Sequence, residues 1–461
     1  MLADTYALGA ATGVEGPLLF LKRTVNVGLN QAVEIEETEG PSRLGYIAAL
    51  DEDTITVEVM DATRGMSLAD TRVRFHGERL QFAVGPDILG RVFDGVGRVI
   101  DGGPQISATK TFNIDGLAIN PAMRASPTDF IETGISTLDI MNSLVRGQKL
   151  PIFSGSGLPH DELAIQIAHQ SRLRGSDVGD FAIVFAAIGV PYDTAERFRR
   201  AMESSGALEH TALFLNLASD SSTQRLLTPR YALTAAEYLA FVEGRHVLVI
   251  MTDMTNYCEA LREVAASHGV VPSRKGFPGY MYSDLATLYE RAGSIKEVPG
   301  SLTQLPILTM PSDDITHPIP DLTGYITEGQ IVLDRVLDRA DIYPPVKVLP
   351  SLSRLMKDGT GENFTHPDHP ALANQLYAAY ARAVHVRVLA SVVGREGLAE
   401  IDQLFLDFGD RFEQQLVHQK GARTLEQSMQ TGWELLRALP VTELTRLDDE
   451  QIKQHITAKP E

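Results

Sequence analysis

The sequence predicts a multidomain protein with an N-terminal β-barrel, a central α/β P-loop-like domain with a mostly parallel sheet, and a C-terminal helical domain. A chain of 461 residues is longer than one hydrophobic core usually holds. The hydrophobic pattern also changes twice, from short alternating strands to apolar strands separated by helical periods, and then to helices alone. We therefore expect three domains, at residues 1–75, 76–350 and 351–461.

The N-terminal segment has the period of half-buried strands. In "TITVEVM", Ile55, Val57 and Val59 alternate with polar residues, and "TRVRF" repeats the trend. Several such short strands joined by turns are typical of a small β-barrel. This segment carries no evident catalytic chemistry.

The central segment alternates apolar strands with helical periods, which favours an α/β domain with a mostly parallel sheet. The helical segments include "DTAERFRRAMESS", "TPRYALTAAEYLAFV" and "SDLATLYERAG", and Pro229 is expected in the first turn of its helix. The order of the strands does not follow from one sequence. The expected strands are residues 181–188, 211–216, 246–253 and 303–310.

After about Leu352 the strand signals fade and apolar residues recur at helical spacing. Segments such as "HPALANQLYAAYARAV" and "TLEQSMQTGWELLRAL" predict a helical domain. One apolar stripe is expected to face its core rather than a ligand. It comprises Leu404, Phe405, Phe408 and Phe412.

The composition limits the partners and the location. A net charge of -19 argues against broad binding to nucleic acid or to anionic lipid, because both require clustered positive charge. No apolar run approaches the roughly 18 residues of a membrane span, and the N-terminus lacks a secretory pattern. The single cysteine, Cys258, fits a reducing compartment. We expect a cytoplasmic protein.

The stretch "FSGSGLPHDELAIQIAHQ" has the strand–glycine–helix course of a phosphate-binding loop, with Gly155, Ser156 and Gly157 at the turn. In a working loop, backbone N–H groups, a lysine and a hydroxyl hold the phosphates and magnesium. Here His160 stands at the second glycine position, Asp161 replaces the lysine, and Glu162 replaces the serine or threonine. A carboxylate about 5 Å from a phosphate charge opposes it by roughly 3 kcal/mol at an effective dielectric near 20.

Two interpretations of this loop remain open. It is either a degenerate nucleotide site with weak or lost binding, or an ordinary connection in which Asp161 and Glu162 complement a helix N-terminus. Asp253, which ends "HVLVIMTD", holds the position of the aspartate that supports magnesium in P-loop enzymes. Any strand end in a parallel sheet can carry such an acid. We expect no metal site on this chain.

Several long segments carry a family resemblance. "TGISTLDIMNSLVRGQKLPIFSGSG", "GFPGYMYSDLATLYERAG", "THPIPDLTGYITEGQI" and "LPSLSRLM" resemble the B subunit of V-type or A-type (V/A-type) rotary ATPases of bacterial or archaeal type. The resemblance extends from "GPLLFLK" to the helical tail. It implies a non-catalytic subunit, and the missing lysine agrees with that role.

The resemblance also implies the assembly. Three such chains alternate with three catalytic A subunits, the β-barrel joins a crown, and the tail faces the rotating stalk. Central and peripheral stalk subunits are further partners, and membrane contact is indirect, on the cytoplasmic face. This chain would hold no cofactor tightly, with Mg-ATP or Mg-ADP at the interface with the catalytic A partner. The assembly couples ATP hydrolysis or synthesis to proton or sodium transport.

Arg354 in "PSLSRLM" matches the family position whose guanidinium reaches the nucleotide of the neighbouring A subunit. Arginine suits that role because it stays charged and bridges phosphate oxygens with a planar fork. From the residues alone, a surface ion-pair partner is the alternative. His317, near Asp313 and Asp314, allows a metal site or proton relay, but its spacing favours a capping or hydrogen-bonded histidine.

Two other functions compete with this interpretation. A self-sufficient ATPase motor with a variant P-loop would hydrolyse ATP by itself. A purely architectural subunit would have no contact with nucleotide, and Arg354 would then be dispensable for turnover.

Overall fold

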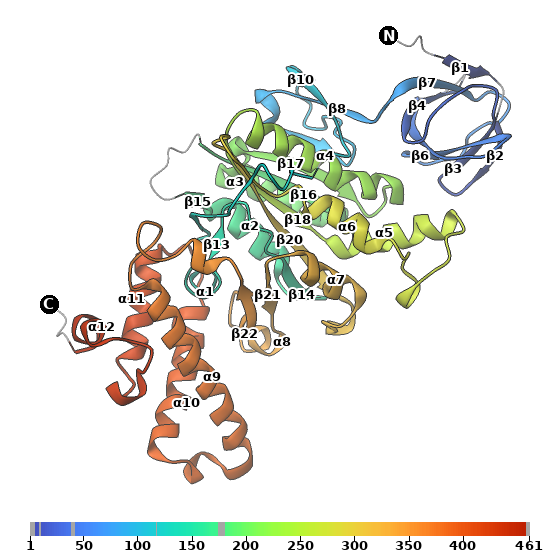
Figure 1. The fold of residues 1–461 in the computed structure, drawn as a ribbon. Helices are drawn as coiled ribbons and strands as arrows, with labels where there is room; N and C mark the ends of the chain where they lie inside the picture. The colour runs from blue at the N-terminus through green and yellow to red at the C-terminus, as the bar shows by residue number, and fades with distance from the viewer. Residues whose placement is uncertain (1–4, 9–10, 38–41, 117, 174–179, 458–461) are drawn as a thin grey trace. The chain divides into compact units, whose positions relative to one another are not determined.

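A computed structural model describes residues 5–8, 11–37, 42–116, 118–173 and 180–457. The chain divides into two compact units, each described by itself (Figure 1). Unit 1 comprises Met1–Pro121 and Ala182–Arg291, and unit 2 comprises Ala122–Phe181 and Ala292–Glu461. The predicted fold class is confirmed by the β-barrel, the mostly parallel α/β layers and the helical tail, whereas the three domain boundaries stay a prediction.

The first part of unit 1 is the β-barrel. Its antiparallel strands follow the order β1-β7-β4-β5-β6-β3-β2. Ile55, Val57 and Val59 lie in its core, as their alternation predicts, but Glu58 on the other face of β6 is also buried. The strands are β1 (Thr5–Leu8), β2 (Ala11–Glu15), β3 (Leu18–Lys22), β4 (Gln31–Glu36), β5 (Arg43–Leu50), β6 (Thr54–Val59) and β7 (Arg72–Arg79).

The rest of unit 1 is α/β. Strands β18 (His246–Thr252), β16 (Phe181–Val190), β17 (Thr211–Leu217) and β9 (Val92–Asp94) neighbour one another in that order, and β17 runs parallel to both β16 and β9. A two-stranded ribbon pairs β8 (Gln81–Val84) with β10 (Lys110–Asn113). The helices are α3 (Tyr192–Ser205), α4 (Ser222–Phe241), α5 (Met254–Ser267) and α6 (Met281–Tyr289).

The expected position of Pro229 is wrong. Helix α4 begins at Ser222, so Pro229 lies inside it rather than in its first turn. The start signal is Ser221, whose hydroxyl accepts a hydrogen bond from the Gln224 N–H at 3.1 Å. Most of α4 is buried, and this packing outweighs the cost of one missing backbone hydrogen bond.

Unit 2 contains the strands that flank the glycine loop. β14 (Ile152–Gly155) lies between β20 (Ser301–Met310) and β21 (Gly329–Leu333) and runs parallel to both, whereas β22 (Val346–Ser353) is antiparallel to β21. Short strands β11 (Arg124–Ala125) and β19 (Gly293–Ile295) extend this sheet, and β12 (Phe130–Glu132) pairs β13 (Leu144–Val145) and β15 (Arg172–Leu173). The helices are α1 (Ser136–Met141), α2 (His160–Gln170), α7 (Pro318–Ile326) and α8 (Arg335–Arg339).

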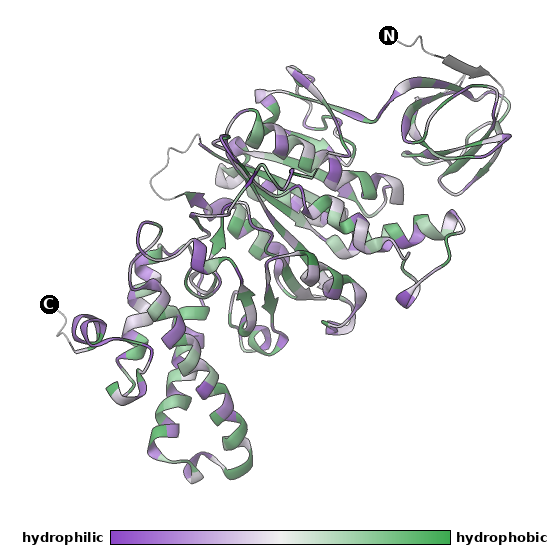
Figure 2. Cartoon of the chain, viewed as in Figure 1, coloured by the Kyte–Doolittle hydropathy of each residue, from purple (hydrophilic) through white to green (hydrophobic). Residues whose placement is uncertain are grey.

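The tail of unit 2 is helical, as predicted, and contains α9 (His369–Val393), α10 (Glu400–Phe412), α11 (Leu425–Leu436) and the short α12 (Asp449–Gln451). Phe405, Phe408 and Phe412 lie in its core together with Trp433. Leu404 does not belong to that core, because 40% of it is exposed. Hydrophobic and hydrophilic residues are interspersed along α9 and α10 (Figure 2), and those of α10 are arranged as expected for a helix with one buried face.

Helix α9 is long and apolar enough to cross a membrane by length and composition, contrary to the expectation from the sequence. Its first half packs in the helical core through residues such as Leu372 and Leu376. Its last turns expose apolar side chains, with Val392 80% exposed. The buried half gives α9 the role of a core helix in the helical domain.

Candidate functional site

The glycine loop joins β14 to α2 in unit 2. Gly155 ends the strand, and Ser156 and Gly157 are exposed at the turn. The His160 ring is turned toward Ser154, with its Nδ1 3.0 Å from the hydroxyl oxygen. Asp161 lies in the first turn of α2, where its carboxylate complements the helix N-terminus.

Glu162 shares this first turn, so both acids have the helix-start position that the second interpretation of the loop assigned to them. A carboxylate is favoured at a helix N-terminus for the same reason that a phosphate is, because both meet the positive end of the helix dipole. The two acids therefore use the electrostatic feature that a phosphate would otherwise exploit.

Two residues that the sequence did not single out for this loop lie against Gly155. Arg335 and Asp313 form a two-pronged ion pair, with Nε–Oδ2 and Nη2–Oδ1 distances of 2.9 Å each. Arg335 Nη2 also donates to the Ser156 carbonyl oxygen at 2.9 Å. A Cβ atom at Gly155 would lie 2.2 Å from Asp313 Oδ1 and 2.7 Å from Arg335 Nη2. The ion pair therefore rests directly on the backbone of the first loop glycine.

Asp253 lies in unit 1, immediately after β18, and is mostly buried. It is the N-cap of α5, and its Oδ1 accepts a hydrogen bond from the Thr255 N–H at 2.7 Å. The structure gives this aspartate a helix-capping contact. The other predicted site residues belong to unit 2.

Arg354 follows β22 and is exposed. Its N–H donates to the Glu328 carbonyl oxygen at 2.9 Å, and its Nη1 donates to the Thr327 carbonyl oxygen at 3.3 Å. Within the described ranges of the chain, its guanidinium forms no ion pair with a carboxylate. An arginine that is held by the backbone but keeps its charge uncompensated is suited to an anion outside its own chain.

The backbone beneath Arg354 is fixed by buried polar contacts. Gln148 Nε2 donates to the Ser353 hydroxyl at 2.9 Å, and the mostly buried Lys149 pairs with Glu328 at 2.7 Å. Gly329 allows β21 and β22 to approach, since a Cβ there would lie 2.2 Å from the Leu352 carbonyl oxygen. Two segments that carried the family resemblance, one around Glu328 and one around Arg354, thus form one rigid corner.

The strand register separates this corner from the glycine loop. Gly155 ends β14, which runs parallel to β21, so the loop lies toward the carboxyl end of β21. Ser353 pairs with Gly329 at the opposite end of β21. With a rise of about 3.3 Å per residue, the two ends of β21 are about 13 Å apart. Arg354 and the loop of the same chain therefore lie at opposite edges of the sheet.

His317 has the predicted capping role. It is mostly buried and is the N-cap of α7, where its Nδ1 accepts a hydrogen bond from the Ile319 N–H at 3.4 Å. Among the residues that the structure describes, no group of three His, Cys, Asp or Glu side chains could hold a metal ion.

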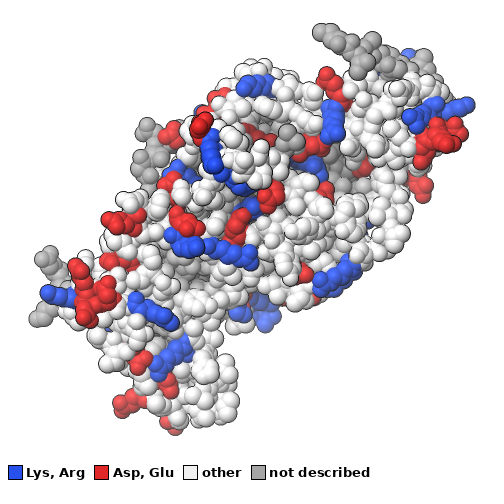
Figure 3. Space-filling model, viewed as in Figure 1, with Lys and Arg blue, Asp and Glu red and all other residues white. Residues whose placement is uncertain are grey.

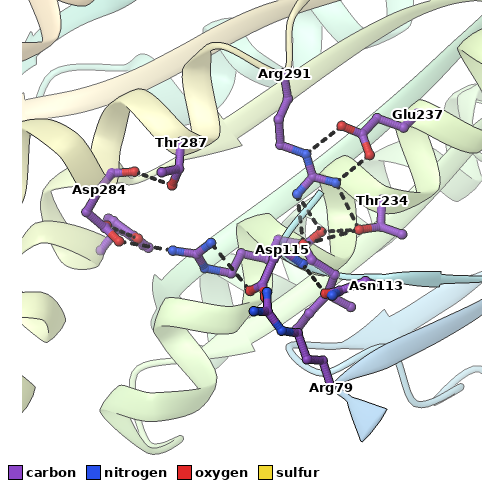
Figure 4. Close-up of polar contacts among 11 residues, drawn as sticks. Arg79, Asn113, Asp115, Thr234, Glu237, Asp284, Thr287 and Arg291 are labelled. Carbon is purple, nitrogen blue, oxygen red and sulfur yellow. Dashed lines mark hydrogen bonds and ion pairs between the residues drawn. The ribbon is translucent and has the colours of Figure 1, made fainter. Parts of the chain in front are cut away.

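A buried polar network in unit 1 was missed by sequence reasoning (Figure 4). Arg291 is 0% exposed and grips Glu237 with two nitrogens, both at 2.7 Å. It also donates to Thr234 Oγ1 and to the Ile114 carbonyl oxygen, both at 2.9 Å. Gly116, with φ +62°, leaves room for the guanidinium, because a Cβ there would lie 2.5 Å from it. The network links distant segments of unit 1 through buried hydrogen bonds and an ion pair.

Unit 1 also contains a cavity of about 640 Å³, lined by residues of β9, β17 and α3. None of the predicted site residues lines it. Its arginines are already paired, as in the contacts of Arg199 with Glu196 and Glu203. Charges of both signs are interspersed on the face drawn in Figure 3, so this face offers no continuous basic surface to a polyanion.

Comparisons with known proteins indicate the same family for each part of the chain. Three family models match: the β-barrel domain of the ATP synthase alpha/beta family at residues 11–77, the nucleotide-binding domain of that family at 134–353, and the C-terminal domain of V and A type ATP synthase at 358–456. The chain is 53% identical over 457 residues to the V-type ATP synthase beta chain of Halothermothrix orenii, covering 99% of this chain and 98% of that protein.

Two further relatives extend these comparisons. The A-type ATP synthase B 1 subunit of Methanospirillum hungatei is 53% identical over 446 residues, 96% of each chain. The solved structure of the ATP synthase subunit NeqB from Nanoarcheaum equitans superposes with a TM-score of 0.74 at 37% identity, covering 88% of this chain and all of that one. At these identities and coverages the similarity is one of family as well as of fold.

Proposed function

We propose, from the premise that this chain belongs to the B-subunit family of V/A-type ATP synthases, that it is a non-catalytic subunit which completes the ATP sites of catalytic A subunits with Arg354. Three copies alternate with three A subunits, and the ring couples ATP hydrolysis or synthesis to proton or sodium transport. The chemistry is centred on the partner, which holds Mg-ATP or Mg-ADP at the interface.

The observation that carries this proposal is the separation of Arg354 from the loop of its own chain. Arg354 follows β22 at the Gly329 end of β21, while the glycine loop lies toward the other end of that strand. An arginine so placed cannot serve the loop of its own chain. In a closed ring with head-to-tail contacts, each subunit meets its two neighbours through different surfaces, so a residue remote from its own loop is free to serve a neighbour.

The chemistry of Arg354 fits an in-trans role. Charge develops on the phosphoryl oxygens in the transition state, and a fixed guanidinium stabilises it without reorganising. The hydrogen bonds to Glu328 and Thr327 fix the backbone and orient the Arg354 side chain. The side chain therefore loses less conformational entropy when it binds phosphate. A movement of this corner during rotation would change both turnover and nucleotide affinity at the partner's site.

The helical tail supports the proposed stalk contact. Val388, Val392 and Val393 expose apolar surface at the end of α9, where a soluble helix in isolation would carry polar residues. We assign the rotating central stalk as the partner of the tail. The peripheral stalk completes the assembly, which is attached to the cytoplasmic face of the membrane through its ion-translocating sector.

The test is Arg354→Ala in a head reconstituted from this chain and its catalytic A partner. We expect a ring of normal mass whose steady-state ATPase rate falls by about 10³-fold or more. Arg354→Lys keeps the charge but loses the planar fork, so it should recover only part of the rate. Lys357→Ala is the matched control, because it removes one positive charge from the same exposed segment.

The same preparation separates the rival functions. A wild-type rate in the Arg354→Ala ring would contradict the proposal and favour a purely architectural subunit. ATP hydrolysis by the purified wild-type chain alone, sustained after removal of contaminating ATPases, would favour the self-sufficient motor. We expect no turnover by the isolated chain.

A further inference from the structure

The topology of unit 2 brings two distant side chains to one point above Gly155. β14 lies between β20 and β21, and all three strands run parallel, so the segments that follow them emerge at one edge of the sheet. Asp313 comes from the turn after β20, and Arg335 is the first residue of α8 after β21. The two residues therefore meet at the loop from opposite sides.

Their contacts engage a guanidinium beside the loop that could otherwise bind a phosphate. The Asp313 carboxylate presents two oxygens to the Arg335 guanidinium at 2.9 Å each, which is the planar fork that arginine also offers to phosphate. The same guanidinium is tied to the loop through the Ser156 carbonyl oxygen. Asp313 Oδ1 lies where a Cβ of Gly155 would point, so the carboxylate fills the space beside the first loop glycine.

The pair is accessible as well as close. The side chains of Arg335 and Asp313 are 34% and 47% exposed, so solvent and solutes reach them. Arg335 lowers the pKa of the Asp313 carboxyl through their hydrogen bond, so the carboxylate stays charged at neutral pH. The loop therefore has a cation near it after all, although its charge is neutralised by an internal carboxylate.

We propose that the Arg335–Asp313 ion pair is an internal plug, in which Arg335 stands in for the missing lysine and Asp313 occupies the place of a phosphate group. The pair makes this loop selective against phosphate-bearing anions. Exclusion of phosphate then depends on Asp313 and not only on the absence of a lysine. This inference rests on the proposed non-catalytic role of the chain, but it concerns the loop and not Arg354.

Binding of inorganic pyrophosphate to the isolated full-length chain tests the plug, with isothermal titration calorimetry as the measurement. Wild type should show no saturable binding in the millimolar range. Asp313→Ala removes the internal carboxylate and leaves Arg335 facing the loop. Pyrophosphate should then bind saturably, with a Kd at least about tenfold below the highest concentration at which wild type shows no saturation. Arg335→Ala should not bind, because it leaves a carboxylate without its cation beside the loop.

Two further variants make the result specific. Asp313→Ala combined with Arg335→Ala should lose the gain, since the cation is gone. Asp314→Ala is the matched control, because it removes the same charge one residue along the chain, from a carboxylate that instead caps Thr316 at 2.9 Å. Thermal melting of every variant confirms that folded protein is compared.

Absence of a gain in Asp313→Ala would overturn the plug, as would an equal gain in the double variant or in Asp314→Ala. These outcomes leave the role of Arg354 untouched, because that role is measured by turnover of the reconstituted ring. Conversely, a wild-type rate in the Arg354→Ala ring would not alter the expected pyrophosphate titration. The failure of one proposal is thus distinguishable from the failure of the other.

Discussion

Arg291 in unit 1 and Arg335 in unit 2 grip a carboxylate in the same way but in different surroundings. Each directs Nε and Nη2 at the two oxygens of one acid, Glu237 for Arg291 and Asp313 for Arg335. Arg291 is fully buried, whereas the side chain of Arg335 is one-third exposed. The ion pair of Arg291 therefore stabilises the fold of unit 1, whereas that of Arg335 is an accessible contact beside a loop. The degree of burial distinguishes the two roles.

The largest effect on stability is expected for Arg291→Ala. The substitution leaves Glu237, whose side chain is 22% exposed, without its cation, and leaves the Ile114 carbonyl oxygen with only a 3.5 Å hydrogen bond from the Thr234 hydroxyl. Breaking a buried pair by removing one partner costs about 3–5 kcal/mol. Urea unfolding of the isolated chain measures the loss.

Arg335→Ala is the matched control for this prediction, because the chemical change is identical and only the burial differs. A loss for Arg291→Ala no greater than that for Arg335→Ala would break the comparison. Arg291→Lys should fall between wild type and Arg291→Ala, since it keeps a charge but cannot fill five donor positions.

Local features of the chain were predictable from the sequence. The strand, turn and helix around Gly155 follow from apolar residues, glycines and acids within one short stretch, and the acids of the first turn lie where the pattern puts them. The aromatic stripe of α10 is buried for the same reason, with Leu404 at its exposed margin. These features depend on interactions between near neighbours in sequence.

The Arg335–Asp313 contact was not predictable, because it depends on which strands flank β14. Strand order is decided by long-range packing, and one sequence contains no measure of it. The burial of Arg291 was hidden for a related reason, since charged residues are almost never fully buried unless paired. Its partners come from segments far apart in the chain, such as those of Ile114 and Glu237.

A pair in which the acid, and not the base, is the buried partner sharpens the comparison. His268 lies with Nε2 3.2 Å from an oxygen of Glu58, which is 2% exposed and also accepts a hydrogen bond from Thr223. The hydrogen bond to Glu58 raises the pKa of His268 above its ordinary value. A raised histidine pKa stabilises the folded state below the unfolded pKa of about 6.5, and this stabilisation is lost as the pH rises through the folded pKa.

We therefore expect His268→Gln to destabilise the chain by on the order of 1 kcal/mol at pH 5.5 and by less at pH 8.5. Glutamine keeps a donor for Glu58 but cannot carry a charge, so the difference between the two pH values isolates the protonated form. Thermal unfolding of both proteins at the two pH values is the measurement. An equal loss at both values would show that the histidine contributes through packing and not through its charge.

The smallest effect on stability is expected for the exposed Arg335–Asp313 ion pair. Asp313→Ala and Arg335→Ala should leave the urea midpoint of the isolated chain unchanged within error, because water replaces each lost contact at an accessible site. The same Asp313→Ala protein should nevertheless gain pyrophosphate binding, so one substitution separates stability from ligand selectivity. A clear drop in midpoint for Asp313→Ala would mean that the fork holds the β14 edge together, and the difference between the two arginines would then be one of degree.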